Sequence, residues 1–107
     1  MDFLKMMQAA QQFSGKMQEL QETLARLTLT GTAGGGLVTV EVDGRGTMKR
    51  VAIDPSVVQP TDVEMLEDLV AVATQEAQKK ARAEAEAEMQ RLAGGLGLGA
   101  LPFKLPV

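Results

Sequence analysis

Apolar side chains recur along residues 2–27 with the spacing of an amphipathic helix. The steps between successive apolar positions alternate between three and four residues, which is the spacing of a helix with one continuous apolar seam. This heptad seam consists of Phe3, Met6, Ala10, Phe13, Met17, Leu20, Leu24 and Leu27. Polar residues such as Lys5, Gln12 and Glu19 fall on the opposite side. The pattern therefore predicts one long helix, in which Gly15 costs about 1 kcal/mol relative to alanine.

After residue 27 the apolar positions recur every second residue, and Thr, Val and Gly replace Gln, Met and Ala as the common residue types. We expect three strands, at residues 28–33, 37–42 and 47–53. The turn signals between them are Gly34-Gly35-Gly36 and Asp43-Gly44. Met48 is out of step with the apolar positions that follow it, so we expect a β-bulge near Lys49.

A second helix is expected to open at Thr61 and to run to about Leu92. Thr61 and Glu64 have the spacing of a capping box. The apolar stripe of this helix consists of Val63, Leu66, Leu69, Val70, Ala73 and Ala77. Residues 79–89 alternate alanine with charge, but Ala, Glu, Lys and Arg are strong helix formers and poor strand formers. We therefore continue the helix through this segment and expect Gly94-Gly95 to end it.

The element order predicts an α+β protomer, α-β-β-β-α, with a three-stranded antiparallel sheet and two long helices. A helix of about 30 residues is about 45 Å long, whereas a six-residue strand spans about 20 Å, so the sheet cannot cover the whole seam. We expect these seam residues to stay exposed in a single chain: Met6, Phe13, Met17 and Leu20. Since burial of such side chains is favourable, we expect a homodimer. Its predicted interface comprises Phe3, Met6, Ala10, Phe13, Met17, Leu20 and Leu24. The alternative is that the first helix folds back along the second within one chain.

The composition narrows the class of protein. The 107 residues fit one domain, which we place at residues 1–93, followed by a Gly-rich, apolar tail at 94–107. The chain has no Cys and no His, so Cys-ligated metals, thiol nucleophiles and histidine bases are excluded. Residues 1–10 do not resemble a signal peptide, and no apolar run approaches the ~20 residues that span a bilayer. We therefore expect a cytoplasmic protein with no membrane partner.

No catalytic site, metal site, cofactor or small-molecule substrate is expected. Glu41, Asp43 and Asp54 flank the predicted hairpin, but they alternate with Arg45 and two further bases, so surface ion pairing explains them better. Residues 31–36 resemble a phosphate-binding loop only in their glycine content. No Lys-Ser/Thr pair follows them, and the next element is a strand rather than a helix.

The net charge of −3 at first argues against a polyanionic partner. Much of the acidity is local, because four acids and no base lie between residues 56 and 68: Asp62, Glu64, Glu67 and Asp68. Subtracting this −4 from −3 leaves +1 for the rest of the chain. These acids fall where a helix N-terminus is expected, and the helix dipole favours carboxylates there. The net charge therefore does not exclude DNA binding. The basic residues are scattered along the chain, and their positions alone are more typical of a solvated helix face than of a binding site.

Several collinear motifs resemble the YbaB/EbfC family across essentially the whole chain. They are the run from Gly31 to Val42, the turn Asp43-Gly44, the triplet Ile53-Asp54-Pro55 and the helical segment from Glu64 onward. The Gln/Met-rich first helix and the closing Leu-Pro-Phe-Lys-Leu-Pro segment are also similar. This resemblance implies a bacterial, nucleoid-associated homodimer whose helices project like tweezers. It also implies binding of double-stranded DNA through the projecting helices, with roles in nucleoid organisation and gene regulation. On these helices the candidate DNA-binding residues are Lys5, Lys16, Lys79, Lys80 and Arg82.

Two functional hypotheses follow. The first is a DNA-binding architectural homodimer in the nucleoid, whose contacts are mainly to phosphate and carry little sequence information. The second is a protein-interaction adaptor that uses the Met/Leu seam and the apolar tail to recruit a partner. A gel shift with competitor DNA at two salt concentrations distinguishes them.

Overall fold

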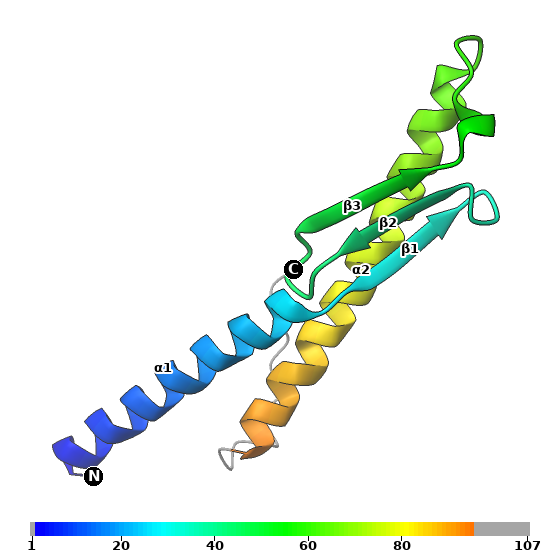
Figure 1. Ribbon diagram of the computed structural model, residues 1–107. Helices are drawn as coiled ribbons and strands as arrows, with labels where there is room; N and C mark the ends of the chain where they lie inside the picture. Colours follow the sequence, from blue (N-terminus) through cyan, green and yellow to red (C-terminus); the bar gives the residue numbers. More distant parts are fainter. Residues whose placement is uncertain (1, 96–107) are drawn as a thin grey trace.

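The computed structural model describes residues 2–95 and shows the expected α+β element order, α-β-β-β-α (Figure 1). The two long helices are α1 (Phe3–Arg26) and α2 (Val63–Gly95). Between them lie β1 (Leu29–Ala33), β2 (Val38–Val42), β3 (Met48–Ile53) and the short 3-10 helix η1 (Pro55–Val57). The protein is elongated, with principal extents of 69 × 23 × 16 Å.

The strands form one antiparallel sheet in the order β1-β2-β3. The register between β2 and β3 is interrupted at one place, where Glu41 pairs with Arg50 and Val42 pairs with Met48. Lys49 is therefore left without a partner across the ladder, and the predicted β-bulge is confirmed at this position. The bulge returns Met48 to the face that carries the valines of β2, because residues directly opposite one another share a face.

The core lies between one face of β2 and the middle of α2. Its most buried side chains are those of Val38, Val40 and Val42 from the strand and Ala73, Ala77 and Ala81 from the helix. The approach is closest at Gly31 of β1, where an added Cβ would lie 2.1 Å from the carbonyl oxygen of Ala73. Small residues on both elements thus let the helix lie directly on the sheet. Ala81 extends the predicted stripe by one turn into the alternating alanine segment.

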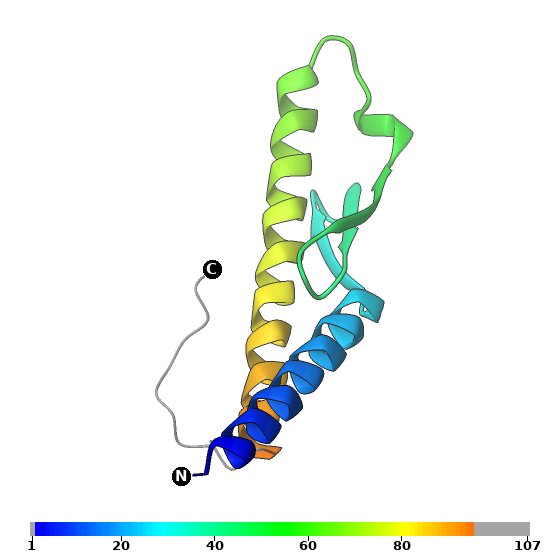
Figure 2. The ribbon, with the colours of Figure 1, turned by 90° about the vertical axis from the view of Figure 1, so that its left-hand side faces the viewer.

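Helix α2 packs on β1 and β2, whereas β3 lies further from the helix (Figure 2). On the side of the sheet that faces α2, the β3 side chains Met48, Val51 and Ile53 are therefore 46%, 40% and 39% exposed. We call these three residues the β3 surface. It is an apolar strip that stays partly exposed within residues 2–95 of a single chain.

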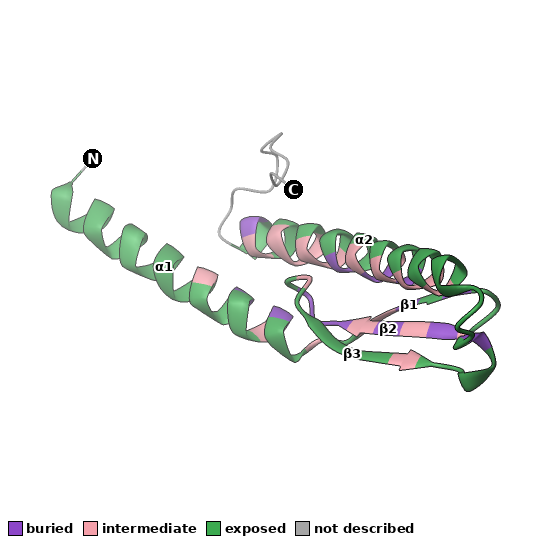
Figure 3. Ribbon diagram, turned by 90° about the horizontal axis from the view of Figure 1, so that it is seen from above, coloured by how far each residue is buried: buried purple, intermediate pink, exposed green. Residues whose placement is uncertain are grey.

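Among residues 2–95, helix α1 packs on the other elements only near its C-terminal end and otherwise projects from them (Figure 3). Leu20 and Leu24 are buried within the chain. The prediction that Leu20 stays exposed in a single chain is therefore wrong, because this end of α1 lies against both α2 and the β2–β3 turn, and Leu20 lines one groove with residues of both. Met6 and Phe13 are exposed as expected, at 51% and 46%, whereas Met17 is only partly exposed. Phe3 is 71% exposed.

The two ends of α2 differ in detail from the prediction. Asp62, rather than Thr61, caps the helix, since its Oδ1 accepts a 3.2 Å hydrogen bond from the backbone N–H of Met65. At the other end the helix runs three residues past the expected Leu92, and its bounds end at Gly95, within the glycine pair that was expected to end it. A glycine costs a helix about 1 kcal/mol, which disfavours the last turn without preventing it. Residues 96–107 of the predicted tail lie outside the described residues, and the boundary at 93/94 stays a prediction.

Candidate nucleic-acid interface

Two of the five predicted DNA-binding residues, Lys5 and Lys16, lie on the exposed part of α1. Lys16 Nζ lies 3.4 Å from a carboxylate oxygen of Glu19, in a pair whose two side chains are about half or more exposed. Such surface pairs contribute only ~0–1 kcal/mol, so a phosphate can compete for this ammonium group. Lys5 is separated from the anchored end of α1 at Leu24 by about 29 Å along the helix axis.

The other three lie on α2 but do not share one face. Lys80 donates a 2.8 Å hydrogen bond to the carbonyl oxygen of Thr30 and lies 3.3 Å from an oxygen of Glu76, so it is engaged on the β1 side. Arg82 is about 200° further around the helix and faces the other way, while Lys79 is within about 60° of Arg82. Both Lys79 and Arg82 are exposed. The structure thus groups Lys79 with Arg82 and separates Lys80 from them.

Arg82 lines a groove of about 620 Å³ between α1 and α2, which we call the interhelical groove. The β2–β3 turn contributes to its wall. Its apolar lining consists of Met17, Leu20, Leu24, Ala81, Ala85 and Met89. Its polar and glycine lining consists of Gln21, Gly44, Arg45, Gly46, Gln78 and Arg82. The lining thus includes two arginines and no acidic residue, in a chain with a net charge of −3.

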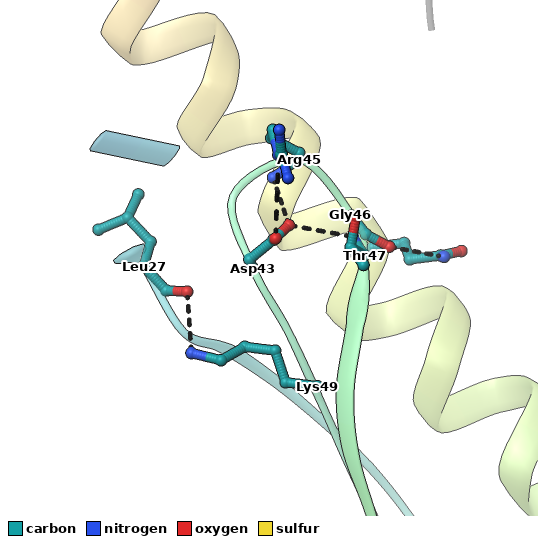
Figure 4. A network of polar contacts seen from close by, with 7 residues as sticks. Leu27, Asp43, Arg45, Gly46, Thr47 and Lys49 are labelled. Atoms are coloured by element: carbon teal, nitrogen blue, oxygen red, sulfur yellow. Dashed lines mark hydrogen bonds and ion pairs between the residues drawn. The ribbon is translucent and has the colours of Figure 1, made fainter. Parts of the chain in front are cut away.

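The conformation of the β2–β3 turn is set by the buried carboxylate of Asp43 (Figure 4). Its Oδ1 accepts hydrogen bonds from the backbone N–H groups of Arg45 at 2.8 Å and Thr47 at 3.0 Å. Gln78 of α2 donates a 3.2 Å bond to the carbonyl oxygen of Gly46 and so ties the turn to the helix. Beyond the turn, Lys49 of the bulge donates a 2.6 Å bond to the hydroxyl of Thr28, where α1 leads into β1.

Arg45 is a residue of this groove that the sequence pattern does not single out, because its place beside Asp43 suggests an ordinary surface ion pair. That pair is long, at 3.9 Å between Arg45 Nε and Asp43 Oδ2, and the arginine side chain is 48% exposed. The sequence does contain a signal, namely an arginine between Gly44 and Gly46 directly after the turn residue Asp43. Whether this arginine belongs to a site depends on how the turn packs against both helices, and the sequence pattern does not reveal that packing.

Within residues 2–95, no three or more of the acidic, His and Cys side chains lie together as a metal ion would require. None of the described helices combines the length and the apolar character needed to cross a membrane. The remaining ion pairs of α2 involve Arg91, which contacts Glu84 and Glu88 further toward the end of the helix.

Comparison with known proteins gives consistent results. The model of the YbaB/EbfC DNA-binding family matches residues 1–96. A nucleoid-associated protein from Gemmatimonas aurantiaca is 49% identical over 106 residues, which cover 99% of each chain. A nucleoid-associated protein from Nitrobacter winogradskyi is 45% identical over 97 residues, covering 91% of this chain and 92% of the relative. The crystal structure of an uncharacterized protein from Helicobacter pylori superposes with a TM-score of 0.67 at 23% identity, covering 90% of this chain and 97% of that one. The last similarity concerns the fold alone.

Proposed function

The chain belongs to the YbaB/EbfC DNA-binding family, and we propose that it binds double-stranded DNA as a homodimer. The family and the names of the relatives support a nucleoid-associated DNA-binding function. The family is defined by DNA binding rather than by an enzymatic activity. In our proposal the protein therefore acts without catalysis and without a cofactor or small-molecule substrate. It organises DNA in the nucleoid, in the bacterial cytoplasm, and influences gene expression through that role.

The observation that carries the proposed DNA site is the pairing of Lys79 with Arg82 on one side of α2. Both side chains are exposed, and neither makes an ion pair with any other residue in the range 2–95. Phosphate contacts by such side chains position a protein on a duplex without reading its bases. Lys5 and Lys16 extend the same role to α1, while Lys80 contributes less because Thr30 and Glu76 already hold it.

The exposed part of the heptad seam supports the proposed homodimer. Phe3, Met6, Ala10 and Phe13 are exposed on a helix that projects from the molecule. Each bulky apolar side chain contributes about 1.5–3 kcal/mol when it is fully buried, so cover by a second copy is favourable. Leu20 and Leu24 are already buried within their own chain and serve mainly to anchor α1. The β3 surface is a second uncovered apolar strip and the alternative place for the interface.

The competing function is that of a protein-interaction adaptor, in which the seam recruits a different protein and DNA contact is incidental. The sequence pI of about 4.9 and the exposed seam favour it. It predicts a stoichiometric protein partner and no shift of duplex DNA in a gel. The family membership favours the DNA-binding function.

The test is fluorescence anisotropy with a labelled duplex and the double variant Lys79→Ala/Arg82→Ala. We expect weaker binding to all sequences by a similar factor and a shallower dependence on salt, because fewer phosphate contacts release fewer counterions. The matched control is Lys49→Ala/Arg50→Ala, which likewise removes two exposed charges, here from β3. If the control abolishes binding and the α2 variant does not, the DNA site lies on the sheet.

A further inference from the structure

We propose that Arg45 of the β2–β3 turn is a DNA phosphate contact that acts together with Arg82 in the interhelical groove. The inference rests on the proposed DNA binding and deepens it. It extends the phosphate-binding surface from the helices to the turn at which they meet. The five candidates predicted from the sequence, by contrast, all lie on α1 and α2.

The charge of the groove is opposite to that of the chain. Arg45 and Arg82 reach it from two different elements, and its other polar side chains are the amides of Gln21 and Gln78. The chain has 14 acidic and 11 basic residues, yet no acid lines this groove. An arginine guanidinium offers several donors in a planar arrangement that matches phosphate oxygens. The charge therefore fits an anion, and the proposed function supplies one in the DNA backbone.

The turn holds the backbone of Arg45 in place from both sides. On one side, the N–H of Gly44 donates a 2.8 Å bond to the carbonyl oxygen of Leu24 in α1. On the other, Gly46 has a φ of 86° and its carbonyl accepts the bond from Gln78 of α2. The N–H of Arg45 itself is bonded to Asp43 at 2.8 Å. The position of this residue is thus fixed by contacts to both helices.

The guanidinium group, in contrast, stays accessible. The Arg45 side chain is 48% exposed, and its ion pair with Asp43 is long at 3.9 Å. Asp43 is more closely engaged with backbone N–H groups of the turn than with this side chain. Because the backbone is already fixed and the cation is accessible, binding orders little more of the chain, which is the condition for a strong phosphate contact.

The lining also indicates what part of DNA the groove accepts. The accessible apolar part of the lining consists of Met17, Ala85 and Met89, which are partly exposed and have no hydrogen bonds to offer base edges. Such a lining suits the sugar, while the two arginines hold the phosphates beside it. We therefore expect the contact to contribute affinity without sequence preference.

The experiment measures duplex binding of the full chain with the substitution Arg45→Gln, by fluorescence anisotropy over a series of salt concentrations. The matched control is Arg50→Gln, which removes the same charge from the exposed side of β3. We expect Arg45→Gln to weaken binding at least tenfold, as for a charge-assisted hydrogen bond. Since each protomer of the variant dimer would bind one phosphate fewer, the salt slope becomes shallower by up to about 1.8. Arg45→Lys should recover most of the slope, because it keeps the charge.

Three results would overturn the inference in distinguishable ways. If the unmutated protein binds DNA and Arg45→Gln behaves like Arg50→Gln, Arg45 is not a contact and the proposed function stands. If the unmutated protein does not bind DNA, the proposed function fails and the inference fails with it. If Arg45→Gln changes the molecular mass in light scattering instead of the DNA affinity, the groove is an interface between copies. Thermal melting of Arg45→Gln verifies folding, and we expect its midpoint to match that of Arg50→Gln.

Discussion

Gly44 and Leu24 are joined by a 2.8 Å hydrogen bond from the N–H of the glycine to the carbonyl oxygen of the leucine. An added Cβ at Gly44 would lie 2.8 Å from that same oxygen and 2.9 Å from a methyl carbon of the Leu24 side chain. This contact anchors α1 against the β2–β3 turn, while the rest of the helix projects. The direction of the exposed arm is therefore set at this pair of residues.

We predict that Gly44→Ala lowers the free energy of unfolding by about 1–3 kcal/mol, since the added methyl group must push the turn away from α1. Urea denaturation measures the change. The matched control is Gly15→Ala, because nothing lies within 4 Å of a Cβ built at this helical position. The control should raise stability by up to about 1 kcal/mol. Equal effects of the two variants would show that the turn does not pack on α1 as described.

A second glycine variant tests the contact between helix and sheet. At Gly31 an added Cβ would lie 2.1 Å from the carbonyl oxygen of Ala73 and 2.4 Å from the backbone nitrogen of Ala77. Both contacts are to backbone, which cannot rotate away. We expect Gly31→Ala to destabilise the protein more than Gly44→Ala does, with a clearly lower midpoint in thermal melting. A melting midpoint unchanged from the parent protein would contradict this packing.

Much of the fold can be predicted from the sequence, because its elements carry strong local patterns. The seam of α1 and the alternating valines of β2 have unambiguous periods, and the misfit of Met48 locates the bulge at Lys49. The ends of α2 are less predictable. Asp62 and Thr61 are both good capping residues, and the free energies of capping at two neighbouring positions differ little.

The site can be predicted only in part, since it depends on contacts between distant segments. Lys79 and Arg82 are recognisable as bases on a helix, and helical geometry alone separates Lys80 from Arg82. The role of the β2–β3 turn cannot be inferred from the pattern, because its contacts to Leu24 and Gln78 join residues 20 or more positions apart. For the same reason the pattern predicts an exposed Leu20, whereas Leu20 is buried where α1 meets α2 and the turn.

The proposed homodimer is tested by two charged substitutions on different surfaces. Phe13 is 46% exposed on α1 and Val51 is 40% exposed on β3, so an aspartate at either position leaves the core of the single chain intact. We expect Phe13→Asp to give a folded monomer in light scattering, because the charge would be desolvated in the interface. Val51→Asp should remain a dimer. The reverse result would place the interface on the β3 surface, and a monomeric parent protein would contradict the proposal.

A pH-dependent contribution to stability is expected at Asp54. Its Oδ1 accepts a 2.9 Å hydrogen bond from the backbone N–H of Ser56, and this bond lowers the pKa of the carboxyl group below its ordinary value. A lowered pKa means that the charged form stabilises the folded state, so the contribution is present near neutral pH and is lost as the pH falls through the lowered pKa. Asp54→Ala should therefore lower the melting midpoint at pH 7 by more than at acidic pH. A difference that grows on acidification would contradict this assignment.

Under the proposed function, a dimer of this protein binds duplex DNA through phosphate contacts. The binding constant of the unmutated protein for one duplex, measured over a range of salt concentrations, tests this. If each protomer neutralises about two phosphates, the dimer neutralises about four and releases their counterions. The plot of log K against log salt should then have a slope of about −3.6. A duplex of different sequence should give a similar slope and affinity. Absence of binding, or an affinity that does not change with salt, would contradict the proposed DNA binding and favour the adaptor function.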